Sequence, residues 1–163
     1  MKHRQPGATR PRPIRHIESE HGRCLIRWRD YNKVSRPDLR WLYHVPNGVA
    51  VSAAQAGMAK AEGLTKGVWD YHLPVRRGNC PGLVIELKKP EYRTRKNGGL
   101  SDEQVDFGAH MRQQGWQTAI AYHWQEAVAA IERYLEFGYA EDMLHVVDLT
   151  NQERTTKRAK GAS

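Results

Sequence analysis

Apolar residues recur along the chain with two different periods, which predict alternating helices and strands. A helical period predicts helices over residues 17–34, 52–63, 101–114 and 125–137. Short apolar runs bounded by turn residues predict strands over residues 41–45, 68–73, 82–88 and 116–122. The resulting order is helix, strand, helix, two strands, helix, strand and helix. This order predicts an α/β domain with a central mixed β-sheet flanked by helices.

Capping and turn residues indicate how these elements are joined. Ser101, with Gln104 three residues later, forms a capping-box pattern that opens the third helix, and Gly115 ends it. Residues 74–81 contain glycine, asparagine and two prolines, which are typical of a short connecting turn. Residues 89–99 are basic and lack periodicity, so they are expected to form a mobile loop over one end of the sheet.

Charge is distributed unevenly along the 163 residues, whose net charge is +8. It is +7 over residues 1–40, −2 over residues 41–150 and +3 over residues 151–163. We expect residues 1–15 to be a disordered basic arm, residues 16–150 one domain, and the last thirteen residues a basic tail. Basic ends around a mildly acidic centre suit a polyanion such as nucleic acid, although solubilising tails have the same composition.

Several classes of protein are excluded by the composition. The apolar runs are far shorter than the ~18 residues of a membrane span, and the first sixteen residues contain no apolar segment of a secretory signal. A cytoplasmic protein without a membrane partner is therefore expected, in a bacterial or phage-infected cell. Cys24 and Cys80 match no zinc-binding spacing, and we interpret them as ordinary thiols.

Three charged residues on two consecutive strands form the candidate catalytic group. Glu86 and Lys88 are separated by one residue, so both leave the same face of the strand while Leu87 points into the core. If the strands pair around the 74–81 turn, Asp70 can reach Glu86 on that face. Two carboxylates so close repel each other unless a cation lies between them, and oxygen ligands fit magnesium. The alternative is a surface salt-bridge cluster, against which stands the apolar run before Glu86.

Five short segments each give weak evidence of a protein family, but their combination is specific. They are Glu20-His21, the turn Tyr43-His44-Val45-Pro46-Asn47-Gly48, the segment Leu64-Thr65-Lys66-Gly67-Val68-Trp69-Asp70, the strand Gly82-Leu83-Val84-Ile85-Glu86-Leu87-Lys88 and the helix start Leu100-Ser101-Asp102-Glu103-Gln104. In this order and spacing, over about residues 18–135, they resemble the VRR-NUC branch of the PD-(D/E)XK nuclease superfamily. The resemblance implies a restriction-endonuclease-like fold and a nuclease domain over residues 16–150.

The resemblance also implies roles for individual residues. Asp70 and Glu86 correspond to the metal ligands of the family, and the backbone carbonyl of Leu87 is expected to join them. Lys88 corresponds to the lysine that attends the attacking water. Gln104 matches a glutamine at the edge of the site.

An acid on the first helix completes the acidic cluster in that family. Glu20 is the best match in this sequence, and Glu18 is the alternative. Trp69 stands where the family usually has a proline before the catalytic aspartate, which removes a rigid turn and no ligand.

The predicted function is that of a magnesium- or manganese-dependent DNA endonuclease of phage or bacterial type. The resemblance implies in-line hydrolysis of a phosphodiester bond that leaves a 5′-phosphate. The alternatives are a catalytically silent nucleic-acid-binding module with the same fold, and a resolvase that acts on branched DNA. The candidate nucleic-acid contacts are Lys66, Asn47, Lys89, Arg93, Arg95 and Lys96.

A homodimer is expected, because one active site cuts one strand and the resembled stand-alone nucleases are typically dimers. The expected interface is apolar surface on the first or the last predicted helix, and the residues considered for it are Leu25, Trp28, Tyr31, Tyr134, Phe137 and Tyr139.

Overall fold

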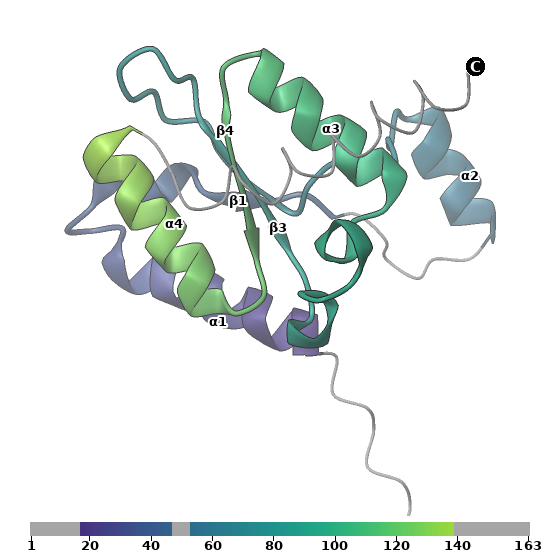
Figure 1. Ribbon diagram of the computed structural model, residues 1–163, viewed down its shortest axis with the longest axis horizontal. Coiled ribbons are helices and arrows are strands. Elements are labelled where there is room, and N and C mark those ends of the chain that lie inside the picture. Colours follow the sequence, from purple (N-terminus) through teal and green to yellow (C-terminus); the bar gives the residue numbers. More distant parts are fainter. Residues whose placement is uncertain (1–16, 47–52, 139–163) are drawn as a thin grey trace, which may run out of the picture.

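The computed structural model describes residues 17–46 and 53–138 (Figure 1). The arm predicted over residues 1–15 and the tail predicted over residues 151–163 lie outside the described residues, as does Asn47. Within the two described stretches, no helix is both long enough and apolar enough to cross a membrane.

Four strands form one mixed sheet in the order β1-β2-β3-β4. They are β1 (Tyr43–His44), β2 (Tyr71–Leu73), β3 (Leu83–Leu87) and β4 (Gln117–Ala121). The pairs β1–β2 and β2–β3 are antiparallel, whereas β3 and β4 are parallel and are connected through a helix. The predicted α/β class and mixed sheet are therefore confirmed.

The sheet lies between two layers of helices (Figure 1). The helices are α1 (Ile17–Asn32), α2 (Ala53–Ala61), α3 (Asp102–Gln113) and α4 (Trp124–Phe137). Helices α1 and α4 contact each other and cover one face, and α3 covers the other face. All four predicted helices are present, with α3 opened by the predicted capping box.

The alternation of side chains along β3 places its residues in two separate cores. Leu83, Ile85 and Leu87 face α1 and α4, and all three are buried in the larger apolar cluster. Val84 faces α3 and belongs to the smaller cluster. A strand covered on both faces carries a nearly continuous apolar sequence, as β3 does. Glu86, 1% exposed, is thus a charged residue inside an otherwise apolar strand.

Three predicted segments differ from the structure in detail. Trp41 ends a 3₁₀ helix, η1 (Pro37–Trp41), because Pro37 favours a helical start there. Strand β2 begins only at Tyr71, although Val45 N still donates to Asp70 O at 2.7 Å. The segment predicted to be a mobile loop contains two 3₁₀ helices, η2 (Pro90–Tyr92) and η3 (Lys96–Gly99).

Candidate active site

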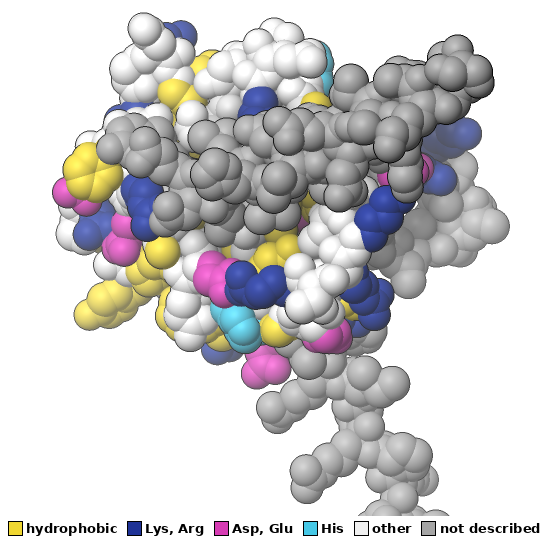
Figure 2. Space-filling view, in the orientation of Figure 1, with side chains coloured by type: hydrophobic (Ala, Val, Ile, Leu, Met, Phe, Trp, Pro, Cys, Tyr) yellow, Lys and Arg dark blue, Asp and Glu magenta, His cyan; other side chains and the backbone are white. Residues whose placement is uncertain are grey.

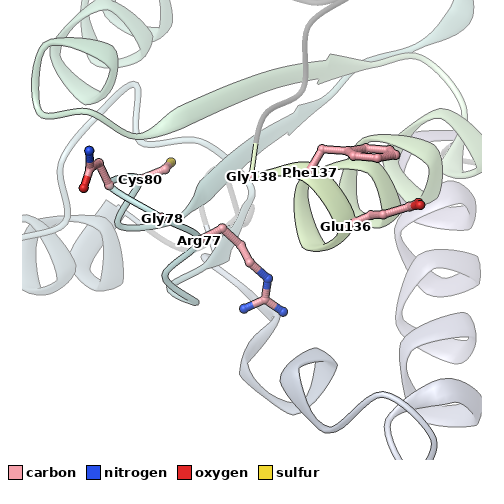
Figure 3. Close-up of a pocket in the computed structure, with 7 residues that line it drawn as sticks. Arg77, Gly78, Cys80, Glu136, Phe137 and Gly138 are labelled. Atoms are coloured by element: carbon pink, nitrogen blue, oxygen red, sulfur yellow. The ribbon is translucent and has the colours of Figure 1, made fainter.

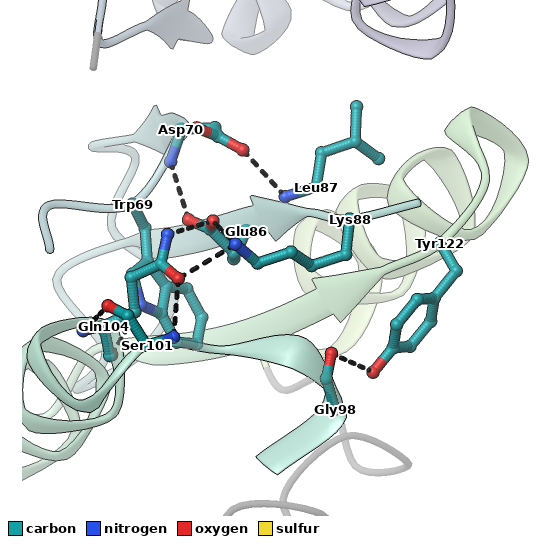
Figure 4. Close-up of polar contacts among 9 residues, drawn as sticks. All are labelled: Trp69, Asp70, Glu86, Leu87, Lys88, Gly98, Ser101, Gln104 and Tyr122. Carbon is teal, nitrogen blue, oxygen red and sulfur yellow. Dashed lines mark hydrogen bonds and ion pairs between the residues drawn. The ribbon is translucent and has the colours of Figure 1, made fainter. Parts of the chain in front are cut away.

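The candidate site lies where β2 begins and β3 ends. These strands are antiparallel and Tyr71 pairs with Ile85, so Asp70 comes to lie opposite Glu86. Leu87 N donates a hydrogen bond to Asp70 Oδ2 at 3.0 Å, and Asp70 N donates to Glu86 Oε2 at 3.3 Å (Figure 4). The hairpin thus brings the two predicted acidic ligands together and fixes each through the backbone of the other strand.

Lys88 follows β3 directly and extends along the same face as Glu86. Its Nζ lies 2.9 Å from Glu86 Oε1 and donates to Gln104 Oε1 at 2.9 Å. Only 13% of the Lys88 side chain and 2% of the Glu86 side chain are exposed. The charged group is therefore centred on a buried carboxylate, with Asp70 and Lys88 partly buried beside it, and the alternative of a surface salt bridge does not fit it.

Burial dominates the electrostatics of Glu86. Removal from water, followed by repulsion from the Asp70 carboxylate, raises the pKa of Glu86 from its ordinary 4.5 to about 8. The ammonium of Lys88 and the backbone N–H of Asp70 act in the opposite direction and lower this pKa. A further positive charge beside Glu86 would favour its ionised form.

Gln104 connects the start of α3 to this cluster. Its side-chain Oε1 accepts from Ser101 N at 3.0 Å, which is one half of the capping box, and also from Lys88 Nζ. Its Nε2 donates to Glu86 Oε1 (Figure 4). The same amide group therefore accepts a hydrogen bond from the backbone N–H of the N-cap residue and contacts two side chains of the candidate site.

Trp69 is a positioning residue that sequence reasoning missed. It is fully buried beneath α3, and its Nε1 donates to Gln104 O at 2.8 Å. Gly108 makes room for it, since a Cβ there would lie 2.5 Å from Trp69 Cζ2. A glycine inside the predicted third helix is the signal that could have indicated this close packing. Because Trp69 precedes Asp70, its anchoring to α3 fixes the place where Asp70 enters the site.

The prediction of a third acid on the first helix concerns Glu20 or Glu18. Glu20 is exposed on α1, and the side chain of Glu18 lies outside the description. Among the described residues, no group of three His, Cys, Asp or Glu side chains could hold a metal ion. The structure thus places two of the predicted acidic ligands together, with Lys88 and Gln104 beside them.

The predicted phosphate contacts that the structure describes come from the segments before β2 and after β3. Lys66 is exposed before β2, where the following Gly67 packs so closely on α3 that a Cβ would lie 2.6 Å from the Glu103 backbone. The others, Lys89, Arg93, Arg95 and Lys96, lie on the segment between β3 and α3. Lys and Arg side chains are visible at several places on the face of the molecule that Figure 2 shows.

The donor set fits a hard divalent cation. Magnesium in proteins is commonly held by one or two carboxylates and keeps several water ligands. Asp70 and Glu86 supply two such carboxylates on adjacent strands. Burial and the Asp70 carboxylate raise the pKa of Glu86, and a bound divalent cation would lower it again.

A separate hollow of about 460 Å³ lies between the β2–β3 turn and the end of α4 (Figure 3). Arg77, Cys80 and Phe137 are among its lining residues, and Glu136 is the carboxylate among them. The turn is at the opposite end of β2 and β3 from Asp70, so this hollow is not part of the candidate site.

Comparison with known proteins supports the fold. No family model matches the chain, and no curated protein matches its sequence. A solved structure described as a VRR_NUC domain protein aligns with a TM-score of 0.59 and 21% sequence identity. The alignment covers 74% of this chain and 88% of that chain. The chain therefore has a fold similar to that of the VRR_NUC domain protein.

Proposed function

We propose that the protein is a magnesium- or manganese-dependent nuclease that hydrolyses phosphodiester bonds in DNA. The observation that carries this proposal is the convergence of Asp70, Glu86, Lys88 and Gln104 at one end of the sheet. The fold similarity to a VRR_NUC domain protein supports it. A buried carboxylate, Glu86, beside a half-buried carboxylate, Asp70, and a lysine is an arrangement that a purely structural role does not require.

Asp70, Glu86 and the backbone carbonyl of Leu87 would hold the metal. Bound there, it would lower the pKa of a water molecule and offset the charge of the scissile phosphate. Glu20 remains a candidate for the acid of the first helix, although the described geometry does not bring it to the pair.

Lys88 is suited to orient the attacking water and to stabilise negative charge on the phosphate. An ammonium has three N–H donors, and in the described part of the chain two acceptors are assigned to it, on Glu86 and Gln104. The third donor is free to contact water or a phosphate oxygen. Because both existing contacts are made without substrate, the position of Lys88 is set in advance.

The test is an assay of the purified protein on duplex, single-stranded, flapped and four-way DNA with magnesium, manganese or EDTA. We expect cleavage that requires a metal and is lost in Asp70→Asn. Activity in EDTA, or undiminished cleavage by Asp70→Asn, would contradict the proposal. The relative rates on the four substrates measure any preference for branched DNA.

A second candidate function is nucleic-acid binding without cleavage. It is favoured by the finding that, among the described residues, no third acid completes a metal-binding group with Asp70 and Glu86. The same assay distinguishes it, because a silent module binds DNA and leaves all four substrates intact with either metal.

A homodimer remains part of the proposal, but fewer residues than the sequence suggests are available for its interface. Leu25 and Tyr134 are fully buried in the core of one chain and cannot form an interface. Tyr31 on α1 and Phe137 at the end of α4 are 87% and 56% exposed. Light scattering with and without DNA would test dimerisation, and a mass of 18.7 kDa without DNA together with one protein chain per DNA in the complex would reject it.

A further inference from the structure

The segment between Lys88 and Ser101 is fixed at both ends by the candidate site. Residues 89–99 carry four Lys and Arg side chains and one Glu. The segment starts directly after Lys88, which bonds to Gln104, and it ends at the capping box that Gln104 forms. Its position beside the reacting groups therefore follows from the chain connection alone.

Arg93 anchors the segment to the neighbouring strand and helix. Its guanidinium lies 4.4 Å from the ring centroid of Tyr122 and forms an ion pair with Glu126 of α4. The hydroxyl of Tyr122 donates to Gly98 O at 3.0 Å. Because its charge is compensated by Glu126, Arg93 has a structural role in the segment.

Arg95 is held in a different way, by an aromatic ring without a carboxylate. Its guanidinium carbon lies 3.8 Å from the ring centroid of Tyr92, and Lys89 Nζ lies 5.8 Å from the same centroid. Tyr92 is half-buried and packs on Gly99, whose φ is +80° and where a Cβ would lie 2.6 Å from Tyr92 Cβ. Arg95 is exposed, and no ion pair with a described carboxylate is assigned to it.

We infer that Lys89, Tyr92 and Arg95 form a subsite for the sugar–phosphate backbone of the nucleic acid, with Arg95 as its main contact. The inference rests on the proposed function and extends it to a binding residue. A guanidinium stacked on a ring directs its N–H groups outward in one plane, which matches two phosphate oxygens. Prior restraint of the side chain also reduces the conformational entropy lost on binding.

Fluorescence anisotropy with a short labelled DNA duplex in EDTA tests the subsite. Arg95→Gln is expected to weaken binding severalfold and to lower the salt slope by about one. Tyr92→Leu keeps every charge and an apolar side chain, and it is expected to weaken binding because Arg95 loses its support. Arg76→Gln is the matched control, because it removes one exposed cation at the β2–β3 turn, the opposite end of the sheet.

If Arg95→Gln and Arg76→Gln weaken DNA binding equally, the inference is overturned, since DNA affinity would then depend only on the net charge of the protein. Wild-type affinity of Tyr92→Leu would overturn it as well. In a cleavage assay, Arg95→Gln is expected to raise KM and leave kcat unchanged. If wild type cleaves DNA while Arg95→Gln has normal Kd and KM, the subsite fails and the proposed function stands. If wild type neither binds nor cleaves, both fail.

Discussion

The ammonium of Lys88 and the carboxylate of Glu86 form a contact of 2.9 Å inside the protein, at the point where β3 ends. One residue separates them in sequence, so this contact is built into a single strand. Gln104 touches both groups from α3. A substitution at any of the three residues is therefore expected to alter the contacts of the other two.

Lys88→Ala is expected to reduce DNA cleavage by about 100-fold or more, because it removes the donor that orients water and stabilises charge. DNA affinity and circular dichroism are expected to change little, since Lys88 lies just after β3 and outside the apolar core. The measurement is single-turnover cleavage at saturating enzyme. An unchanged rate would remove Lys88 from the mechanism.

Magnesium is expected to raise the melting temperature of wild type but not of Asp70→Asn. A ligand that binds only the folded protein stabilises it by about 2.7 kcal/mol at a hundredfold excess over Kd. Glu62→Gln, an exposed carboxylate just after α2, is the control and is expected to behave as wild type. Normal magnesium binding by Asp70→Asn in calorimetry would exclude Asp70 as a ligand.

The free energy of unfolding is expected to depend on pH through Glu86 when no metal is present. The folded protein keeps a proton on Glu86 up to about pH 8, whereas the unfolded chain releases it near pH 4.5. The folded state thus binds more protons in this window, so Glu86 contributes a loss of stability as pH rises through it. In urea titrations in EDTA, Glu86→Gln is expected to lack this loss. Parallel pH profiles for the two proteins would argue against a raised pKa.

Gln104→Ala and Ser101→Ala are both expected to lower stability, and Gln104→Ala is expected to reduce cleavage much more than Ser101→Ala does. Both variants break the capping box, at a cost of about 1 kcal/mol. Only Gln104→Ala also removes the contacts to Lys88 and Glu86. Urea denaturation and single-turnover rates measured on both variants separate the two effects. Equal rates would show that Gln104 acts only on the helix.

Gly108→Ala is expected to destabilise the protein by about 1–3 kcal/mol, because its Cβ would collide with Trp69. Displacement of Trp69 is also expected to weaken magnesium binding, since Asp70 follows it directly. Gly57→Ala on α2 is the matched control. Nothing lies within 4 Å of its Cβ, so it is expected to stabilise the helix by up to about 1 kcal/mol. Similar stabilities of the two variants would contradict the packing argument.

The parts of the site that sequence could predict depend on short-range rules. The period of a strand places Glu86 and Lys88 on one face, and the short 74–81 connection predicts the antiparallel pairing that brings Asp70 to them. The capping box predicts where α3 begins. Each of these features involves residues that are neighbours in one element or across one turn.

Other features of the site depend on packing between segments that are distant in sequence. The spacing of apolar and polar residues does not predict them. The hydrogen bond from Trp69 to Gln104 joins residues 35 positions apart. The stacking of Arg95 on Tyr92 occurs in a segment without periodicity, where the sequence predicts a mobile loop. The position of Glu20 likewise depends on how α1 packs, which residue spacing within the helix does not determine.

The shared oxygen of Gln104 makes the first turn of α3 and the arrangement of Lys88 interdependent. Fraying of that turn breaks the bond from Ser101 N and releases the acceptor of Lys88 in the same event. Local opening at this helix end therefore also separates Lys88 from Gln104 in the candidate site. The amide hydrogen-exchange rate at the start of α3 therefore reports the fraction of molecules in which Lys88 and Gln104 are in contact. Activity is expected to decline on heating as this local opening grows, before the sheet itself unfolds.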